Sequence, residues 1–336
     1  MILPLPGSSP PSSSPSAELE PSSGAGSEVA PQLSAEELAS RARAYAEAAL
    51  AKNSRRAYAA DWRVWAAWCT ARGQAELPAT PETVAAYLIE HAGARKISTL
   101  SRHLTTIRRA HGAADLDDPT DDERVRTVWM GIRREHGVGR TQKRALVAAD
   151  LRRVLALVED DLAGARDSAL LCVGLATGMR RAELAALEVF DLGWEEQGVI
   201  LRLRRSKTDQ EGVGRSIALH YGRDGTCPVV ALKRWLEVAG IEEGKIWRQV
   251  RYGRVLGPLA PQSIARMLKR RAAAAGLDET QVSGHSLRAG HVTQRYQGGD
   301  DAGDIMETTG HTKMETMLGY KRATPWRKNV TAAVDL

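Results

Sequence analysis

Residues 137–147 lack the apolar periodicity that runs through the chain on either side of them. This short segment contains Gly137 and Gly139 together with Arg140, Lys143 and Arg144, a composition typical of a basic linker. Helical periodicity dominates residues 34–136, whereas residues 148–336 combine helical patterns with one stretch of strand-like alternation. The sequence therefore predicts a mainly α-helical protein with two domains, at residues 34–136 and 148–336, joined by a linker at residues 137–147.

The first 33 residues have a different composition. Half of the 14 prolines fall within the first 31 residues, among serines and glycines and few large apolar side chains. Such a segment cannot bury enough apolar surface to offset the entropy lost on ordering. We therefore expect residues 1–33 to form a disordered tail, followed by a helix that begins at a capping box between Ser34 and Glu37.

Charge and cysteine usage restrict the partners and the compartment. No Lys or Arg precedes Arg41 but five glutamates do, so the remainder of the chain carries 47 basic and 36 acidic side chains. This excess favours a polyanion, although charge alone does not separate DNA from RNA or an anionic membrane. Cys69, Cys172 and Cys227 lack metal-ligand spacing and indicate buried thiols in a reducing cytosol. We expect a cytoplasmic protein because no signal peptide or membrane-spanning stretch is evident.

The first domain offers several polar surfaces. One helix carries the apolar stripe Tyr58, Trp62, Trp65 and Cys69, and Ser54, Arg55 and Arg56 lie at its start. A second helix, at residues 98–111, has an apolar side and an opposite polar side that consists of Thr99, Arg102, Thr106 and Arg109. The polar side is either a surface that lies along a nucleic acid or an ordinary solvated face, and the helix alone does not decide between them.

In the second domain, a largely buried helix at residues 168–175 ends at Gly178, which places Arg180 at a chain turn. Residues 198–205 and 215–219 alternate and predict a β-hairpin with Lys207 at the edge of its loop. Further helices are expected near residues 151–158, 228–237, 261–275 and 286–297. The fold class is therefore mainly α with a small antiparallel β-hairpin.

The second domain also contains the side chains needed to cut a phosphodiester without a metal. Tyr320 is a weak nucleophile at neutral pH because a phenol has a pKa of about 10, and His285 or Lys207 could accept its proton or stabilise the phenolate. Arg180 and Arg288 could bind the non-bridging phosphate oxygens and stabilise the five-coordinate transition state. Each residue has an ordinary structural interpretation when taken alone, but their ordered combination favours catalysis.

This ordered series, Arg180, Lys207, His285-Ser-Leu-Arg288, His311 and Tyr320, resembles the active-site series of the tyrosine recombinase (phage integrase) family. The resemblance extends from about Ser34 to Tyr320, and residues 61–69 and 127–135 resemble one bacteriophage member in particular. His311 differs from that member, which carries tryptophan, and matches the wider family. Glu183 fits a carboxylate that orients Arg180, or a surface ion pair.

The resemblance implies a two-domain recombinase whose first domain clamps the duplex. Tyr320 would form a 3′-phosphotyrosine, His285 would take its proton, Lys207 would protonate the leaving 5′ oxygen and His311 would hydrogen-bond the phosphate. No metal or other cofactor is expected, and the implied partners are double-stranded DNA and a homotetramer on two duplexes, in which the tail after Pro325 docks on a neighbour. Once bound to DNA, the protein would be associated with the nucleoid.

Candidate DNA contacts are drawn from both domains and from the linker. By resemblance, the helix after Pro261 enters the major groove with Gln262 where the bacteriophage member has a base-reading arginine, and with Arg266 one turn later. The other candidates are Ser54, Arg55, Arg56, Thr99, Arg102, Thr106, Arg109, Lys143 and Arg144. Two alternatives stay open: a DNA-relaxing enzyme like the type IB topoisomerases, and a non-catalytic DNA-binding accessory protein.

Overall fold

The computed structural model describes residues 33–34, 36–38, 40–41, 45, 52–137, 142–204, 214–222 and 224–321. The chain divides into two compact units, Met1–Gly139 and Arg140–Leu336. Ser34 and Glu37 form the predicted capping box, since the Glu37 N–H donates to Ser34 Oγ at 3.2 Å and the Ser34 N–H donates to Glu37 Oε2 at 2.8 Å. Residues 1–32 of the predicted tail, Lys207 and the segment after Pro325 lie outside the described residues.

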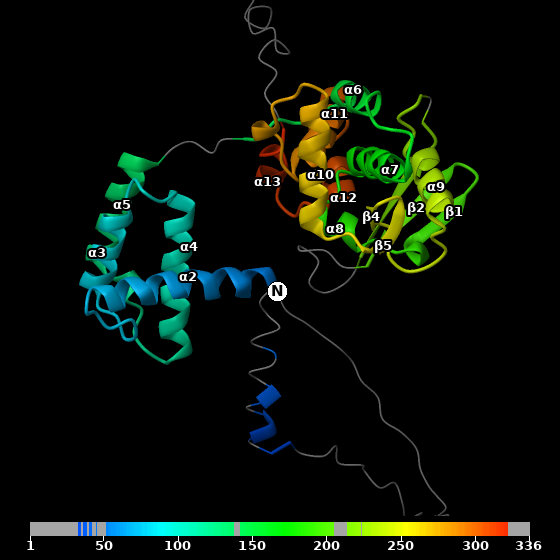
Figure 1. Ribbon diagram of the computed structural model, residues 1–336. Helices are drawn as coiled ribbons and strands as arrows, with labels where there is room; N and C mark the ends of the chain where they lie inside the picture. The colour runs from blue at the N-terminus through cyan, green and yellow to red at the C-terminus, as the bar shows by residue number, and fades with distance from the viewer. Residues whose placement is uncertain are drawn as a thin grey trace, which may run out of the picture. The chain divides into compact units, whose positions relative to one another are not determined.

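The first unit is helical in its described part (Figure 1). Its elements are α2 (Lys52–Ala71), α3 (Pro81–His91), α4 (Ile97–Ala113), a 3-10 helix (Pro119–Asp121) and α5 (Glu123–His136). Thr80 caps α3 as predicted, accepting a hydrogen bond from the Thr83 N–H at 3.2 Å, and Pro81 takes the first helical position.

Two aromatic rings mark the core of the first unit. Trp65 from α2 and Tyr87 from α3 are buried and meet edge to face, with ring centroids 5.1 Å apart. Polar side chains join this core with their hydrogen bonds satisfied: the Tyr87 hydroxyl lies 2.6 Å from His103 Nδ1, and His111 Nε2 accepts from the Ala79 N–H. The buried face of α4 therefore includes two histidines as well as aliphatic residues.

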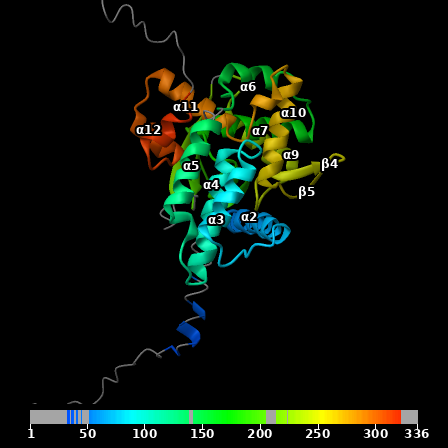
Figure 2. The ribbon, with the colours of Figure 1, turned by 90° about the vertical axis from the view of Figure 1, so that its left-hand side faces the viewer.

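The second unit is built around one buried helix, α7. The helices are α6 (Ala148–Leu155), α7 (Leu162–Thr177), α8 (Arg181–Ala186), α9 (Pro228–Ala239), α10 (Pro261–Ala274), α11 (Ser286–Gly298), α12 (Ala302–Thr309) and α13 (Met314–Leu318), with 3-10 turns at Val189–Asp191 and Glu279–Gln281. Figures 1 and 2 show α7 in the middle of the unit, in contact with α6, α9 and α11. Gly178 ends α7 in the left-handed conformation at φ 60°, as the sequence predicts.

Two antiparallel sheets complete the second unit. The first has the order β1 (Leu192–Glu195), β2 (Gly198–Leu203), β3 (Arg215–His220), and the second pairs β4 (Arg248–Arg251) with β5 (Arg254–Pro258). The predicted hairpin is β2–β3, in register with buried Leu201 opposite buried Ile217. The mainly α fold with a small antiparallel sheet is thus confirmed, while β1 and the β4–β5 hairpin were not predicted.

Two helices, α7 and α6, differ from their predicted ranges by three residues or more. Helix α7 begins six residues before Ser168, at Leu162, because the Asp161 carboxylate accepts from the Gly164 N–H at 2.6 Å and caps it. Helix α6 ends at Leu155, so Val158 packs against the core from the turn that follows rather than from the helix. No helix among the described residues is long and apolar enough to cross a membrane.

Candidate active site

Arg180 and Glu183 form one hydrogen-bonded unit at the start of α8. The Arg180 backbone N–H donates to Glu183 Oε2 at 2.9 Å, and its Nη1 donates to Glu183 Oε1 at 2.8 Å. Arg180 also donates from Nη2 to the Gly310 carbonyl at 3.2 Å, which links α8 to the turn before His311. Glu183 is buried, so the carboxylate orients Arg180 and is not a surface partner of it.

Another arginine, Arg215, binds the same carboxylate, and the sequence analysis did not single it out. Arg215 opens β3 and donates from Nη2 to Glu183 Oε2 at 2.9 Å. Its side chain is only 15% exposed, and its buried Nε has no hydrogen-bond partner. The alternation of β3 predicted the strand but gave no signal for this contact, because Arg215 and Glu183 are 32 residues apart.

Arg288 is a fully buried guanidinium on α11. Nη1 donates to the Gly178 carbonyl at 2.7 Å, Nη2 lies 2.9 Å from His311 Nε2, and the buried Nε has no partner. Burial, together with the positive charge of Arg180, lowers the pKa of Arg288 to about 10. The side chain nonetheless carries its charge at neutral pH, and it would gain from a bound anion.

His311 is held as a neutral imidazole. Burial and the charges of Arg288, Arg180 and Arg215 lower its pKa to about 3. The Thr309 hydroxyl donates to the Ile305 carbonyl at 2.5 Å and lies 2.7 Å from His311 Nδ1, so it accepts from an Nδ1–H. We assign this tautomer from the contact with Thr309; it leaves Nε2 without a proton, while Arg288 Nη2 lies 2.9 Å from Nε2 and 3.2 Å from Nδ1.

Tyr320 follows α13 and lies among these residues. Its hydroxyl is 3.3 Å from His285 Nδ1, its ring centroid is 5.2 Å from that of His311, and the Arg288 guanidinium lies 5.2 Å from the ring centroid. His285 is exposed and immediately precedes α11, so its imidazole is placed to share the phenolic proton. The structure therefore brings together five predicted residues: Arg180, His285, Arg288, His311 and Tyr320.

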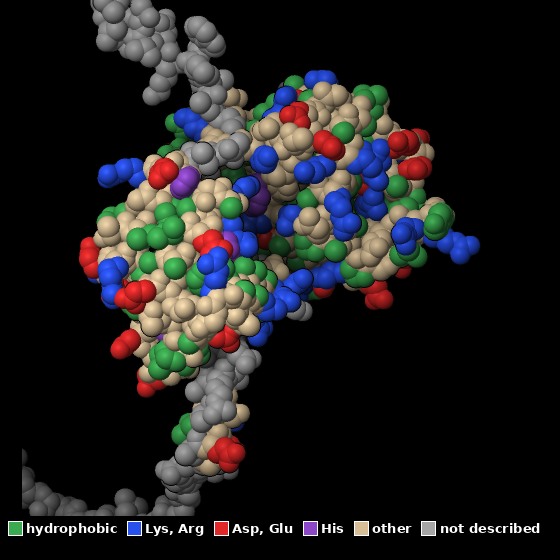
Figure 3. Space-filling model, turned by 60° about the vertical axis from the view of Figure 1, so that its left-hand side comes forward, with side chains coloured by type: hydrophobic (Ala, Val, Ile, Leu, Met, Phe, Trp, Pro, Cys, Tyr) green, Lys and Arg blue, Asp and Glu red, His purple; other side chains and the backbone are tan. Residues whose placement is uncertain are grey.

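The described part of the site has an excess of positive charge. Arg180, Arg215 and Arg288 surround the buried Glu183 carboxylate, and His311 adds no charge at neutral pH. Three guanidiniums against one carboxylate leave a net positive site, which is stable only where an anion or solvent can compensate. Figure 3 shows Lys and Arg side chains spread over the face of the second unit that is in view.

A histidine within α11, His291, packs against the turn that carries Arg180. Its Nδ1 donates to the Leu175 carbonyl at 3.0 Å, its Nε2 is buried without a partner, and burial lowers its pKa to about 4. A Cβ added at Gly178 would lie 2.7 Å from His291 Cδ2, so the turn that carries Arg180 is tightly packed on this ring. The sequence analysis did not single out His291.

The predicted DNA contacts on the first unit have different surroundings. Arg55, Arg56 and Arg109 are exposed, whereas Ser54 and Thr99 are partly buried, and Arg109 lies 5.6 Å from the Tyr58 ring centroid. Arg102 remains 46% exposed while it forms a bidentate ion pair with the buried Asp61. Thr106 is buried and donates its hydroxyl to the Arg102 carbonyl at 3.0 Å, so its placement on the exposed side was wrong.

Two residues at the end of the linker, Lys143 and Arg144, were predicted to contact DNA and form hydrogen bonds within the second unit. Lys143 Nζ donates to the Thr280 carbonyl at 2.6 Å, and Arg144 Nη2 donates to Asp150 at 2.7 Å. The Arg144 N–H also donates to the Gln281 carbonyl at 2.8 Å. Residues 142–147 therefore belong to the second unit, where Ala145 and Leu146 are buried while the Arg144 side chain is still 46% exposed.

Helix α10 and the β4–β5 hairpin present polar side chains to solvent. Gln262, Arg266 and Lys269 are exposed along one side of α10, and Ala260 before it can supply no side-chain cap to the first helical turn. At the hairpin tip, Tyr252 is 97% exposed at φ 51°, between the exposed Arg251 and Arg254. The sequence signal for this hairpin was the Tyr252-Gly253 pair between Val250 and Val255.

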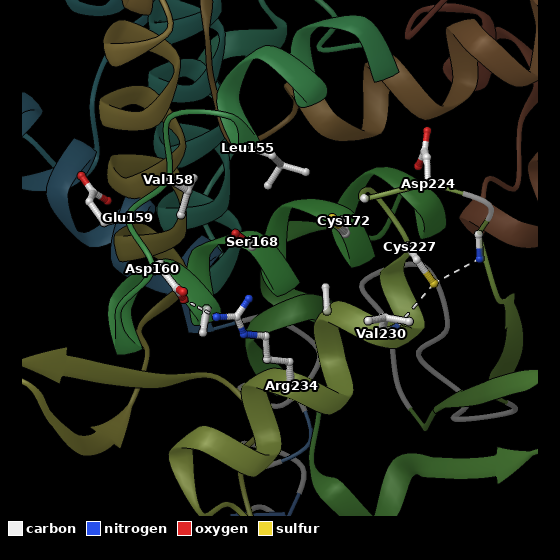
Figure 4. Close-up of a pocket in the computed structure, with 15 residues that line it drawn as sticks. Leu155, Val158, Glu159, Asp160, Ser168, Cys172, Asp224, Cys227, Val230 and Arg234 are labelled. Atoms are coloured by element: carbon white, nitrogen blue, oxygen red, sulfur yellow. Dashed lines mark hydrogen bonds and ion pairs between the residues drawn. The ribbon is translucent and has the colours of Figure 1, made fainter.

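A separate cavity of 380 Å³ lies between α7, α9 and the loop that follows α6 (Figure 4). Cys172 and Cys227 line it together with aliphatic side chains, and an ion pair between Arg234 and Asp160 lies at one side. Cys227 caps α9, because its sulfur accepts from the Val230 N–H at 3.5 Å. Of the predicted catalytic residues that the structure describes, none lines this cavity, so it is distinct from the site around Tyr320.

The chain is similar in sequence to known proteins. The model of the phage integrase family matches residues 144–326. An integrase/recombinase XerD homolog of Selenomonas ruminantium is 38% identical over 290 residues, which cover 84% of this chain and 85% of its own. Recombinase Cre of Escherichia phage P1, the bacteriophage member noted above, is 27% identical over 282 residues, covering 77% of this chain and 81% of its own.

Solved structures support the same fold. A lambda integrase tetramer bound to a Holliday junction superposes with a TM-score of 0.61 and 18% identity, over 87% of this chain and 78% of the lambda chain. At this identity the likeness concerns the fold alone. The family model, however, spans more than half of the chain, and the bacterial relative is similar along most of its length. The chain therefore belongs to the phage integrase family of tyrosine recombinases.

Proposed function

We propose that the protein is a site-specific DNA recombinase that cuts and rejoins DNA through a 3′-phosphotyrosine intermediate, without metal or ATP. The observation that carries this proposal is the position of the Tyr320 hydroxyl, 3.3 Å from His285 Nδ1, with its ring beside the Arg288 guanidinium. A phenol that lies next to a proton acceptor and next to a cluster of guanidiniums with a net positive charge is suited to attack on a phosphodiester.

The proposed reaction is a reversible exchange of one ester for another. The Tyr320 oxygen attacks phosphorus while His285 takes the phenolic proton, and Arg180 and Arg288 stabilise the charge on the non-bridging oxygens. The bond to the 5′ oxygen breaks, and that oxygen receives a proton from Lys207. Rejoining runs the same steps backwards, with the 5′ hydroxyl of the same or another strand as nucleophile, so the bond energy is conserved in the phosphotyrosine.

For His311 we propose a role that differs in part from the sequence expectation. In the tautomer assigned above, Nε2 lies 2.9 Å from Arg288 Nη2 and has no proton to give to a phosphate. A hydrogen bond from His311 to the phosphate would require the proton to move to Nε2 and the Thr309 hydroxyl to donate to Nδ1. His311 therefore first holds Arg288, and donates to phosphate only after this exchange of tautomers.

The proposed partner is double-stranded DNA, bound by a homotetramer across two duplexes. A lambda integrase of the same fold is known as a tetramer on a Holliday junction, which motivates the assembly proposed for this chain. On the second unit, the exposed Gln262 and Arg266 and the hairpin tip around Tyr252 are proposed DNA contacts, joined on the first unit by Arg55, Arg56 and Arg109.

The test is a duplex that carries a nick near the cleavage site, so that the short product diffuses away and the covalent adduct accumulates. DNA sites are first selected from a random pool at a stated salt concentration. Wild type should form an adduct that maps to Tyr320, and Tyr320→Phe should bind the same DNA but form none. Two differently labelled duplexes should then yield recombinant product; relaxation without exchange would instead identify a topoisomerase-like activity.

A further inference from the structure

We propose that Arg215 is a positioning residue of the phosphate site, acting through Glu183 on Arg180. The inference rests on the proposed function and adds a residue to the series recognised in the sequence. It starts from the fact that one buried carboxylate serves two arginines: Glu183 Oε1 binds Arg180, while Oε2 binds both the Arg180 N–H and Arg215 Nη2.

The sharing of Glu183 bears directly on catalysis. A buried arginine paired with a carboxylate of its own is largely neutralised, and its attraction for a phosphate falls accordingly. Because Arg215 binds the same carboxylate, the Arg180–Glu183–Arg215 group keeps a net positive charge. Arg215 also fixes the orientation of the carboxylate to which Arg180 Nη1 donates, and so helps to hold the Arg180 guanidinium in place.

Arg215 also contacts the turn that carries His311. A Cβ placed on Gly310 would lie 2.0 Å from Arg215 Nη1, and Gly310 has φ 65°, which favours glycine. The Gly310 carbonyl accepts from Arg180 Nη2 at 3.2 Å, so both arginines meet this residue from different elements. Arg215 thus joins β3, the start of α8 and the turn after α12 around the proposed phosphate position.

The chain offers a matched control on the same sheet. Arg204 follows β2 and binds a buried carboxylate, Asp191 Oδ1, at 2.9 Å, as Arg215 binds Glu183. Asp191 accepts from Arg204 and from the Glu188 N–H, whereas Glu183 accepts from Arg180 and Arg215, and the Arg204 side chain is 57% exposed. Arg204→Gln therefore removes a comparable arginine–carboxylate pair that does not include Glu183.

The experiment compares Arg215→Gln, Arg215→Lys, Arg204→Gln and Glu183→Gln on the nicked duplex at saturating DNA. We expect Arg215→Gln to bind DNA within about 3-fold of wild type but to form the adduct at least ~10-fold more slowly, because the loss falls on the transition state. Arg215→Lys, which can still pair with Glu183, should recover part of the rate. Arg204→Gln should react at the wild-type rate, and thermal unfolding checks that each variant is folded.

The double variant Glu183→Gln/Arg215→Gln decides whether Arg215 acts through Glu183. If it does, adding Arg215→Gln to Glu183→Gln should change the rate by less than about 3-fold, because coupled residues are not additive. A full additional loss would make Arg215 a direct phosphate ligand and overturn the positioning role, as would a wild-type rate for Arg215→Gln. Absence of adduct with wild type would overturn the proposed function itself.

Discussion

The Tyr320 hydroxyl lies 3.3 Å from Nδ1 of His285, although 35 residues separate the two in the sequence. His285 is exposed just before α11 and Tyr320 follows the short helix α13, so the packing of the three consecutive helices α11, α12 and α13 creates the pair. A distance of 3.3 Å is long for an O–H to nitrogen bond, and it is expected to shorten when a phosphate is bound.

If His285 takes the phenolic proton, His285→Ala should slow adduct formation most near neutral pH. The defect should shrink as the pH rises towards about 10, the ordinary pKa of a phenol, because hydroxide can then remove the proton. The measurement is the rate of single-turnover adduct formation on the nicked duplex between about pH 6 and about pH 9.5. A defect of constant size across that range would assign His285 to phosphate binding instead.

Lys207 lies outside the described residues, so its proposed role as the general acid needs a chemical test. A substrate whose leaving 5′ oxygen is replaced by sulfur does not need a proton donor, because a thiolate is a good leaving group. Lys207→Ala should therefore be slow on the ordinary substrate and should recover on the sulfur substrate. Arg288→Lys serves as the control, because a transition-state defect should persist on both; an unrelieved Lys207→Ala would reassign Lys207 to phosphate binding.

Base recognition can be tested on α10, where Gln262 is exposed in the first turn. If its amide bonds an adenine in the major groove, Gln262→Ala should relax specificity at one position of each half-site by about 1–3 kcal/mol. Arg109→Ala should instead weaken binding to all sequences and flatten the salt dependence, as loss of a phosphate contact does. Binding to a series of single-base substitutions checks both; identical profiles for wild type and Gln262→Ala would exclude base reading.

Local patterns predicted the parts of the fold that local chemistry determines. Gly178 ends α7, Thr80 caps α3 and alternation marks β2 and β3, because turn residues, caps and periodicity act over a few residues. The order of the catalytic residues predicted the site because the same order occurs in a known family, whereas local conformational preferences say nothing about distant residues. That order includes Arg180, His285, Arg288, His311 and Tyr320, which the fold brings together.

The features that were missed depend on packing between distant residues. Arg215 is an ordinary strand arginine until β3 is placed against Glu183. The polar face of α4 was predicted wrongly because only apolar residues were used to locate the core. His103 and His111 are buried on α4 with their hydrogen bonds satisfied, and the buried face extends to Thr106. Polar core residues of this kind are invisible to hydrophobic periodicity.

His291 gives a prediction for stability that does not involve DNA. Its pKa is lowered to about 4, first by burial and then by Arg295 and Arg288, while Asp300 acts in the opposite direction. An unfolded histidine titrates near pH 6.5, so between these values the unfolded state binds more protons and the native state loses stability as the pH falls. Because of His291, the free energy of unfolding should be about 2 kcal/mol lower at pH 5 than at pH 7.

The test measures urea unfolding at several pH values for wild type and His291→Phe, which keeps a ring against Gly178 but cannot titrate. The variant should be less stable than wild type at pH 7, because it loses the hydrogen bond to the Leu175 carbonyl, yet its stability should fall less steeply towards pH 5. His311 titrates in the same direction, so some acid dependence will remain in His291→Phe. Equal slopes for wild type and His291→Phe would mean that His291 becomes protonated in the native state as readily as in the unfolded chain, contrary to its buried position.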